Sequence, residues 1–323
     1  MKNLILTIAF FGYAWQLSSQ DFVDADSYPF NNSFANVEDV NYVMPTSDGG
    51  YLLVGSIEFD GDSKDWDGRV VKVDANGTEL WEDWFGGSGL DYFYGAIELD
   101  NGYYVCGART ESGIGLQPVI ALYRTDGEFV GSKVLGTPGF QGEGLSIVRT
   151  YNGGMLLAGY LKNNTTGIDE GFLLPLTDGV VPIDNTQFRL TSFSKIGKVV
   201  QSADGEYLAF GTRFLSDEAC NTPQVNDEAN YSKRVPVAYD GGDALVAKFT
   251  ITADQQWTTW RTWEESIGGD TGDFFIDGVA TSDGGYAILG KTICVSEVIG
   301  EDSGPDNITE IDGLFYPHWL YKG

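Results

Sequence analysis

The stretch Asp48-Gly49-Gly50-Tyr51-Leu52-Leu53-Val54-Gly55 recurs along the chain as a turn, an apolar run of four residues and a closing glycine. Matching segments end at Gly107, Gly159 and Gly211, so the closing glycines are 52 residues apart three times in succession. A fifth copy ends at Gly290, 79 residues after the fourth. Self-similarity at such a period indicates an array of identical supersecondary units.

Each copy carries the signals of a small antiparallel sheet. Asp-Gly and Asn-Gly pairs supply the positive φ that tight hairpin turns need. The apolar run fits a strand buried on both faces, and no long stretch shows the spacing of an amphipathic helix. One such sheet cannot bury both faces alone, but sheets packed face to face around an axis can. We therefore predict an all-β propeller of about five four-stranded blades; a parallel β-helix would have a shorter period.

The repeat also divides the chain. We expect a single propeller domain over residues 20–323, with repeats at about 39–90, 91–142, 143–194, 195–272 and 273–323 and an insertion at about 214–242. Two interpretations fit the last repeat, which holds a third strand at residues 318–322. The chain is a piece of a longer ring, or residues 21–30 supply the fourth strand and close five blades. We expect closure, because it leaves no long edge strand exposed.

The first residues predict export. Lys2 precedes an apolar run at residues 4–15, and the small residues Ser18 and Ser19 follow, as in a signal peptide covering residues 1–19. A run of this length is too short to span a bilayer comfortably. We therefore expect a secreted or cell-surface protein without membrane insertion.

The net charge of the chain excludes some classes of binding partner. The formal net charge is −28, from 47 acidic and 19 basic residues. Such a surface repels nucleic acid and anionic lipid, so neither is an expected partner.

One acidic loop is a candidate cation site. Four carboxylates lie within eight residues, and hard oxygen ligands of this kind suit a structural Ca²⁺ ion: Asp60, Asp62, Asp65 and Asp67. The loop departs from the twelve-residue calcium pattern, because Lys64 interrupts it and no glutamate closes it. The alternative interpretation is a solvated acidic loop.

A second group of acids follows the repeat. Acidic residues stand sixteen or seventeen positions before a closing glycine in four copies: Asp39, Asp91, Glu143 and Asp273. Their repetition predicts a repeated structural role, such as accepting backbone N–H groups. The Asp of each Thr46-x-Asp48-x-Gly50 type segment is likewise expected to close a hairpin.

Aromatic residues fall into two sets. Those at equal offsets in different repeats are expected to pack between sheets: Trp81, Trp84, Trp257 and Trp260, with Trp263 nearby. Those off the repeat frame are candidates for binding a ligand or partner: Trp66, Tyr316 and Trp319.

The three cysteines suggest one bridge. Cys106 lies inside an apolar strand and is expected to be a small buried residue. Cys220 and Cys294 each follow a closing glycine in long connections of successive repeats, so we treat them as a candidate disulfide.

The unit that runs from Thr46-Ser47-Asp48-Gly49-Gly50 through Asp74-Ala75-Asn76-Gly77 to Phe85-Gly86-Gly87-Ser88 resembles the propeller repeat of secreted Bacteroidetes proteins. The resemblance covers roughly residues 30–323. Proteins of that kind often carry a C-terminal sorting domain for type IX secretion, and none is recognisable in this sequence. The resemblance implies the fold and export, and it does not specify a ligand.

Catalytic patterns are weak. His318 is the only histidine, no G-x-S-x-G segment occurs, and zinc ligands are lacking. We expect a non-enzymatic propeller that binds a protein or glycan, in adhesion or surface assembly. The alternative is a glycoside hydrolase or lyase that uses acidic residues in the central channel, since such chemistry needs only two or three carboxylates.

Overall fold

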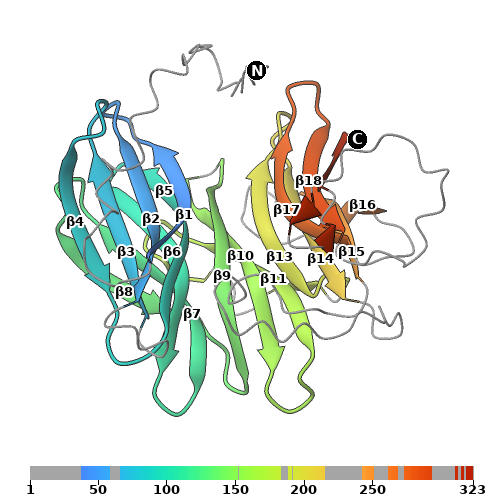
Figure 1. Cartoon of the computed structure of the whole chain (residues 1–323), viewed down its shortest axis with the longest axis horizontal. Helices are drawn as coiled ribbons and strands as arrows, with labels where there is room; N and C mark the ends of the chain where they lie inside the picture. The colour runs from blue at the N-terminus through green and yellow to red at the C-terminus, as the bar shows by residue number, and fades with distance from the viewer. Residues whose placement is uncertain are drawn as a thin grey trace.

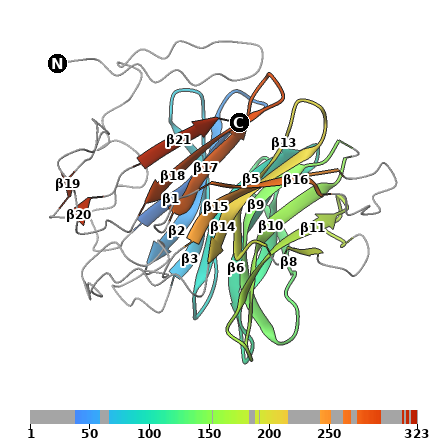
Figure 2. The same cartoon turned by 90° about the vertical axis from the view of Figure 1, so that its right-hand side faces the viewer.

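The structure is a computed structural model, which describes residues 38–58, 66–151, 153–182, 188–190, 192–214, 242–250, 261–267, 273–292, 310–311, 314–315 and 318–322. Within these ranges every regular element is a β-strand (Figures 1 and 2). Across the same residues no helix has the length and apolar character to span a membrane.

All but two of the described strands form five consecutive antiparallel sheets, each of which we call a blade. The first blade contains β1 (Glu38–Pro45), β2 (Tyr51–Glu58), β3 (Trp66–Val73) and β4 (Glu79–Phe85). The second contains β5 (Asp91–Leu99), β6 (Gly102–Glu111), β7 (Gly115–Tyr123) and β8 (Phe129–Val134). The third contains β9 (Phe140–Arg149), β10 (Met155–Asn163), β11 (Asp169–Leu176) and β12 (Phe188–Leu190).

The last two blades keep the same order of strands. The fourth contains β13 (Lys195–Gln201), β14 (Tyr207–Phe214), β15 (Gly242–Phe249) and β16 (Arg261–Ile267). The fifth has three described strands, β17 (Asp273–Ala280), β18 (Tyr286–Thr292) and β21 (His318–Lys322), and a separate pair joins β19 (Glu310–Ile311) to β20 (Leu314–Phe315). The prediction of an all-β propeller with about five blades is confirmed.

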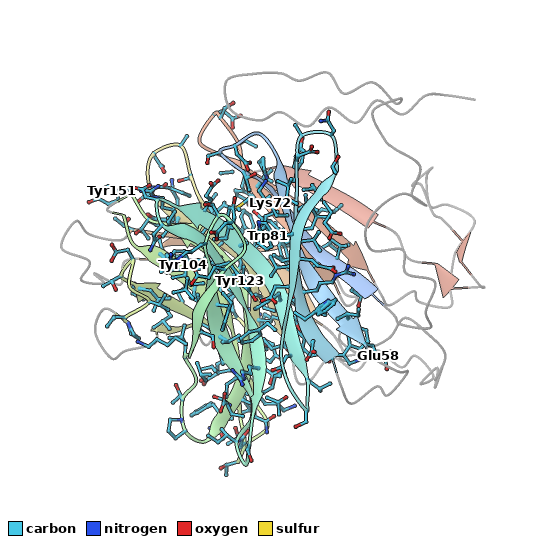
Figure 3. All side chains as sticks on the ribbon, turned by 90° about the vertical axis from the view of Figure 1, so that its left-hand side faces the viewer. Glu58, Lys72, Trp81, Tyr104, Tyr123 and Tyr151 are labelled. Atoms are coloured by element: carbon cyan, nitrogen blue, oxygen red, sulfur yellow. The ribbon has the colours of Figure 1, made fainter. Side chains whose placement is uncertain are left out.

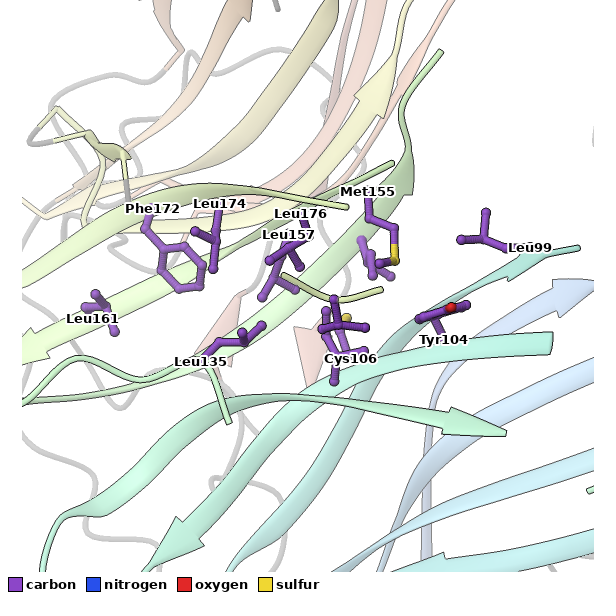
Figure 4. Packing of buried hydrophobic residues seen from close by; sticks show 13 residues of the cluster. Leu99, Tyr104, Cys106, Leu135, Met155, Leu157, Leu161, Phe172, Leu174 and Leu176 are labelled. Carbon is purple, nitrogen blue, oxygen red and sulfur yellow. The ribbon is translucent and has the colours of Figure 1, made fainter. Parts of the chain in front are cut away.

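Apolar cores lie between successive blades. Between the second and third blades, Tyr104 and Cys106 pack against Met155, Leu157 and Phe172, all at most 2% exposed (Figure 4). Three similar clusters join the first blade to the second, the third to the fourth and the fourth to the fifth. Each large apolar side chain buried in this way stabilises the fold by roughly 2 kcal/mol.

The hairpins between the first and second strands of a blade are closed as the sequence predicted. Gly49 adopts a φ of 87°, and Asp48 Oδ1 accepts hydrogen bonds from the Thr46 hydroxyl and the Gly50 N–H. The Nζ of the buried Lys72 lies 2.9 Å from Asp48 Oδ2. These partners lower the pKa of Asp48 to about 2, the Thr46 hydrogen bond contributing most. The carboxylate therefore serves the turn.

These hairpins define two ends of the molecule. The hairpins from first to second and from third to fourth strand gather at one end, which we call the turn end. The connections from second to third strand, such as those after β6 and β10, lie at the opposite end, the loop end (Figure 1). The predicted insertion at 214–242 joins β14 to β15, so both of its anchoring strands reach the loop end.

The closing glycines have a steric cause. A Cβ on Gly55 would lie 1.8 Å from the carbonyl oxygen of Asp39, and a Cβ on Gly107 would lie 1.8 Å from that of Tyr92. Gly159 and Gly211 meet innermost-strand carbonyls at 1.9 Å and 2.0 Å in the same way. No side chain fits there, because the clash is with backbone that a rotamer change cannot relieve.

This contact predicts a position-specific cost. Gly107→Ala should lower the free energy of unfolding by about 3 kcal/mol, because the added methyl forces β5 and β6 apart. Gly87→Ala is the matched control, since a Cβ there meets nothing within 4 Å. Urea unfolding of both variants checks this, and equal midpoints would contradict the steric explanation.

Candidate functional site

The first strand of every blade lines the centre of the propeller. Each of these innermost strands contacts the innermost strand of the next blade, in the order β1, β5, β9, β13, β17. Each also breaks register with its neighbour at one place, which leaves one extra residue opposite the closing glycine region: Asn41, Tyr94, Leu145, Gly197 and Ile276. Bulges of this kind bend a strand and turn its side chains.

The position after each bulge is also equivalent in all five blades. It pairs with the residue that precedes the closing glycine, and it holds Tyr42, Gly95, Ser146, Lys198 and Asp277. We call the polar and aromatic members of these two positions the axial cluster: Asn41, Tyr42, Tyr94, Ser146, Lys198 and Asp277. One repeated backbone feature therefore presents six side chains of five different kinds on the innermost strands.

Polar contacts link successive blades through this cluster. Asn41 Nδ2 donates to the carbonyl oxygen of Phe93 at 2.6 Å. Ser146 Oγ accepts from the Val199 N–H at 3.1 Å. Lys198 Nζ lies 2.5 Å from Asp277 Oδ1. These contacts join the first blade to the second, the third to the fourth and the fourth to the fifth.

Electrostatics relates the fifth blade to the first. Burial raises the pKa of Tyr42 above its usual range, and the negative charge of Asp277 contributes to this shift. The charge of a fifth-blade residue thus reaches a phenol of the first blade. Asp277 also accepts the Gly278 N–H at 2.8 Å, which fixes its carboxylate. The axial cluster therefore draws on both the first and the last described blades.

The axial cluster can recognise a polar ligand. Phenol, amide, hydroxyl, ammonium and carboxylate groups offer both donors and acceptors within one ring of strands. Asn41 and Asp277 are exposed, whereas Tyr42, Tyr94, Ser146 and Lys198 are half-buried. Few convergent polar groups beside aromatic surface are the usual chemistry of a small-molecule or sugar site.

The recurring acids do not share one place, which corrects the sequence prediction. Asp39 and Glu143 pair with the residue after the closing glycine, whereas Asp91 and Asp273 pair with the residue after that. Adjacent strand positions point to opposite faces of a sheet. The spacing misled for Asp91 because the second blade's turn is shorter. Five residues separate the paired Pro45 and Tyr51 in the first blade, and four separate the equivalent pair Glu98 and Tyr103 in the second.

The predicted structural role, accepting backbone N–H groups, is confirmed for Asp91. Asp91 accepts the N–H groups of Gly87 and Thr110, both at 3.1 Å, as predicted for these acids. Glu143 instead accepts the Tyr160 hydroxyl at 2.9 Å.

A second carboxylate lies beside Asp91. A Cβ on Gly86 would be 1.8 Å from Asp67 Oδ1 and 2.9 Å from Asp91 Oδ2, so both carboxylates close around this glycine. Burial, with the charge of Asp67 adding to it, raises the pKa of Asp91 to about 6. Asp91 is only 2% exposed and Asp67 is half-buried, so the first of these two carboxylates is closed off in the blade junction.

Asp91 should therefore make stability depend on pH. Its folded-state pKa lies above the ordinary value of 3.8, so its ionisation weakens the fold as pH rises through the window from 4 to 6. Compared with Asp91→Asn, the unmodified protein should lose on the order of 2 kcal/mol between pH 4 and pH 7.

Asp74→Asn is the control for this measurement, because turn N–H groups lower the pKa of Asp74 and the sign should reverse. Chemical unfolding at several pH values gives both differences. A pH-independent difference between the unmodified protein and the Asp91 variant would refute the shift.

Most of the sequence-predicted site residues lie outside the described ranges: Asp60, Asp62, Asp65, Tyr316, Cys220 and Cys294, together with the side chain of Trp319. The calcium loop and the disulfide stay predictions. Among the described residues no three His, Cys, Asp or Glu side chains gather as metal ligands would.

Two predicted residues are described in full. Asp67, the last acid of the calcium loop, packs against Gly86 beside Asp91. Trp66 is 6% exposed, and its ring lies 6.1 Å from that of Tyr92 in the next blade. Trp66 thus packs at a junction, in a place unlike that of an open ligand platform.

The repeat tryptophans behave in two ways. Trp81 packs between blades as predicted, since its ring stacks with Tyr123 at 6.2 Å and its Nε1 donates to the Thr125 carbonyl (Figure 3). Trp84 on the same strand is 49% exposed. Trp257 and Trp260 and the side chain of Trp263 fall outside the described residues. Cys106 is fully buried, as predicted, and burial raises its thiol pKa.

The axial cluster itself was missed by sequence reasoning. Its members differ in every blade, so no residue repeats at those positions. The sequence distance from each closing glycine could have located these positions, but it does not indicate which residue types would form a site there.

No family model matches the chain, and no curated protein matches it. Three solved structures are similar to it. An endo-arabinase from Bacteroides thetaiotaomicron is 11% identical, with 88% of this chain and 93% of that chain covered and a TM-score of 0.43. CoXyl43, a GH43 β-xylosidase/α-arabinofuranosidase from a compost metagenome, is 9% identical over 89% and 91%, with a TM-score of 0.44.

The third is the mannose phosphorylase MPT-4 from Leishmania mexicana, 11% identical over 78% of this chain and 80% of that chain, with a TM-score of 0.44. At these identities and TM-scores the likenesses carry no argument about activity. The fold follows from the five sheets of the chain itself.

Proposed function

We propose that this protein is a secreted or cell-surface β-propeller that binds a glycan at its axial cluster without cleaving it, in adhesion or surface assembly. The observation that carries the proposal is the mixture of groups on the innermost strands. Tyr42 and Tyr94 offer aromatic surface, and Asn41, Ser146 and the Lys198–Asp277 pair offer hydrogen bonds. Sugars present C–H faces and hydroxyl groups, which match these two kinds of contact.

The charge of the chain supports a neutral or cationic glycan. The formal net charge of −28 disfavours anionic polymers such as nucleic acid. Lys198, the one basic member of the axial cluster, is already paired with Asp277. The cluster therefore offers no uncompensated positive charge that would select a sulfated or acidic sugar.

Glycan-array binding tests this proposal. The unmodified protein should bind a neutral polysaccharide, and Tyr94→Ala should weaken that binding at least tenfold by removing aromatic surface. Tyr151→Ala is the matched control, because Tyr151 is 59% exposed in a hairpin at the turn end. Binding only to protein partners, or equal loss in both variants, would contradict a glycan site at the axis.

The alternative is a glycoside hydrolase or lyase. Hydrolysis of a glycosidic bond ordinarily uses two carboxyl groups about 5 to 9.5 Å apart. Asp277 is the one carboxylate of the axial cluster as defined here, and its partner is Lys198. Asp91, which lies beside the half-buried Asp67, is 2% exposed and therefore closed to a substrate. These facts favour binding over cleavage for the described part of the chain.

An assay for reducing sugar released from arabinan, xylan and mannan separates the two functions. We expect no release by the unmodified protein. Release that Asp277→Asn abolishes, with folding unchanged by circular dichroism, would replace the binding proposal with the enzymatic one.

A further inference from the structure

The innermost strands carry a second set of equivalent positions beside the axial cluster. In every blade one innermost-strand residue pairs with the residue that follows the closing glycine: Asp39, Tyr92, Glu143, Lys195 and Phe274. The second axial position pairs with the residue that precedes this glycine, and residues two apart on a strand share a face. We call the five residues the loop-end ring, because they continue this face toward the loop end. The side chain of Phe274 lies outside the described residues.

This face differs in polarity on the two sides of the axial cluster. Toward the loop end its described side chains all carry polar groups and are half-buried: Asp39, Tyr92, Glu143 and Lys195. Toward the turn end the equivalent positions, two residues beyond the second axial position, are all apolar: Met44, Ile97, Val148, Val200 and Val279. Four of these five side chains pack in or against the junction cores. A polar ligand at the axial cluster therefore finds further polar partners on this face only toward the loop end.

Contacts of the loop-end ring join the third blade to the fourth. Tyr160 donates its hydroxyl hydrogen to Glu143 Oε1 at 2.9 Å. Lys195 Nζ lies 5.0 Å from the centre of the Tyr160 ring, where cation–π attraction holds it. Among the described residues Glu143 Oε2 has no hydrogen-bond partner. This carboxylate can therefore accept hydroxyl groups of a ligand while Tyr160 fixes its orientation.

Tyr92 connects the loop-end ring to the axial cluster in the second blade. Its ring centre lies 6.1 Å from that of Tyr94, with an angle of 33° between the two ring planes. Both side chains are half-buried, so aromatic surface remains partly open at two neighbouring positions. Aromatic faces of this kind pack against the C–H faces of sugars.

We propose that the loop-end ring is a second sugar subsite, so that the ligand of the axial cluster is an oligosaccharide whose next residue lies toward the loop end. This inference rests on the proposed glycan binding at the axial cluster. Residues two apart on a strand are separated by roughly 7 Å, which a disaccharide can span. Tyr92 supplies the stacking surface, and Asp39 and Glu143 accept hydroxyl groups. Two carboxylates against the one ammonium of Lys195 favour a neutral or amino-substituted sugar over an acidic one.

Calorimetric titration with sugars of different length tests the second subsite. The probes are three pairs of a monosaccharide and its trisaccharide: glucose and cellotriose, xylose and xylotriose, and mannose and mannotriose. For the sugar that the protein binds, the trisaccharide should bind roughly tenfold tighter, because it adds a stacking contact and hydrogen bonds. Tyr92→Ala and Glu143→Ala should each remove most of this gain and leave the affinity for the monosaccharide unchanged.

Val148→Ala is the matched control. Val148 and Glu143 belong to the same strand and the same face, on opposite sides of the axial cluster. The control should keep the full gain, with folding of all variants verified by circular dichroism. Equal affinities for both lengths in the unmodified protein, or a gain that survives Tyr92→Ala and Glu143→Ala, would overturn the second subsite and leave glycan binding standing. Absence of binding to all six sugars and to the glycan array would instead contradict the proposed function, and the second subsite with it.

Chemical-shift mapping by NMR gives a second readout of direction. The backbone amide signals of Glu143 and Lys195 should move when the trisaccharide is added and stay in place with the monosaccharide. The signals of Val148 and Val200 should respond equally to the two sugars. Additional shifts confined to Val148 and Val200 would place the second sugar toward the turn end and overturn the proposal.

Discussion

In four blades the carbonyl oxygen of an innermost strand lies where the Cβ of a closing glycine would be, at 1.8 to 2.0 Å. That approach is possible only for glycine, and it occurs beside a bulge that inserts one residue into the innermost strand. The bulge and the glycine are thus one feature. Together they set two consecutive positions of every innermost strand, from which Asn41, Ser146 and Lys198 contact the next blade.

This coupling separates what repeats from blade to blade from what differs between the blades. The glycine, the hairpin and the apolar run repeat because each blade needs them to pack. The two positions at the bulge hold different residues in each blade, so the first blade presents Tyr42, and the fourth and fifth blades present the Lys198–Asp277 pair. A propeller built in this way can place unlike groups around one axis without altering its cores.

The repeat made the fold predictable from the sequence, because Gly55 and its copies report a backbone requirement that no other residue satisfies. The turn function of Asp48 and the packing of Trp81 were predictable for the same reason. The acids were not, since a turn shorter by one residue moved Asp91 to the opposite face from Asp39. The axial cluster also escaped prediction, because bulges have no residue signature on the bulged strand.

Hydrogen exchange in a Gly159→Ala variant is the most direct test of the link between closing glycine and axis. A methyl there would meet the Glu143 carbonyl at 1.9 Å. The account predicts faster exchange in β9 and at the Val199 N–H that Ser146 accepts, with β11 still protected. Uniform loss of protection across the third blade, or no change at the axis, would contradict it.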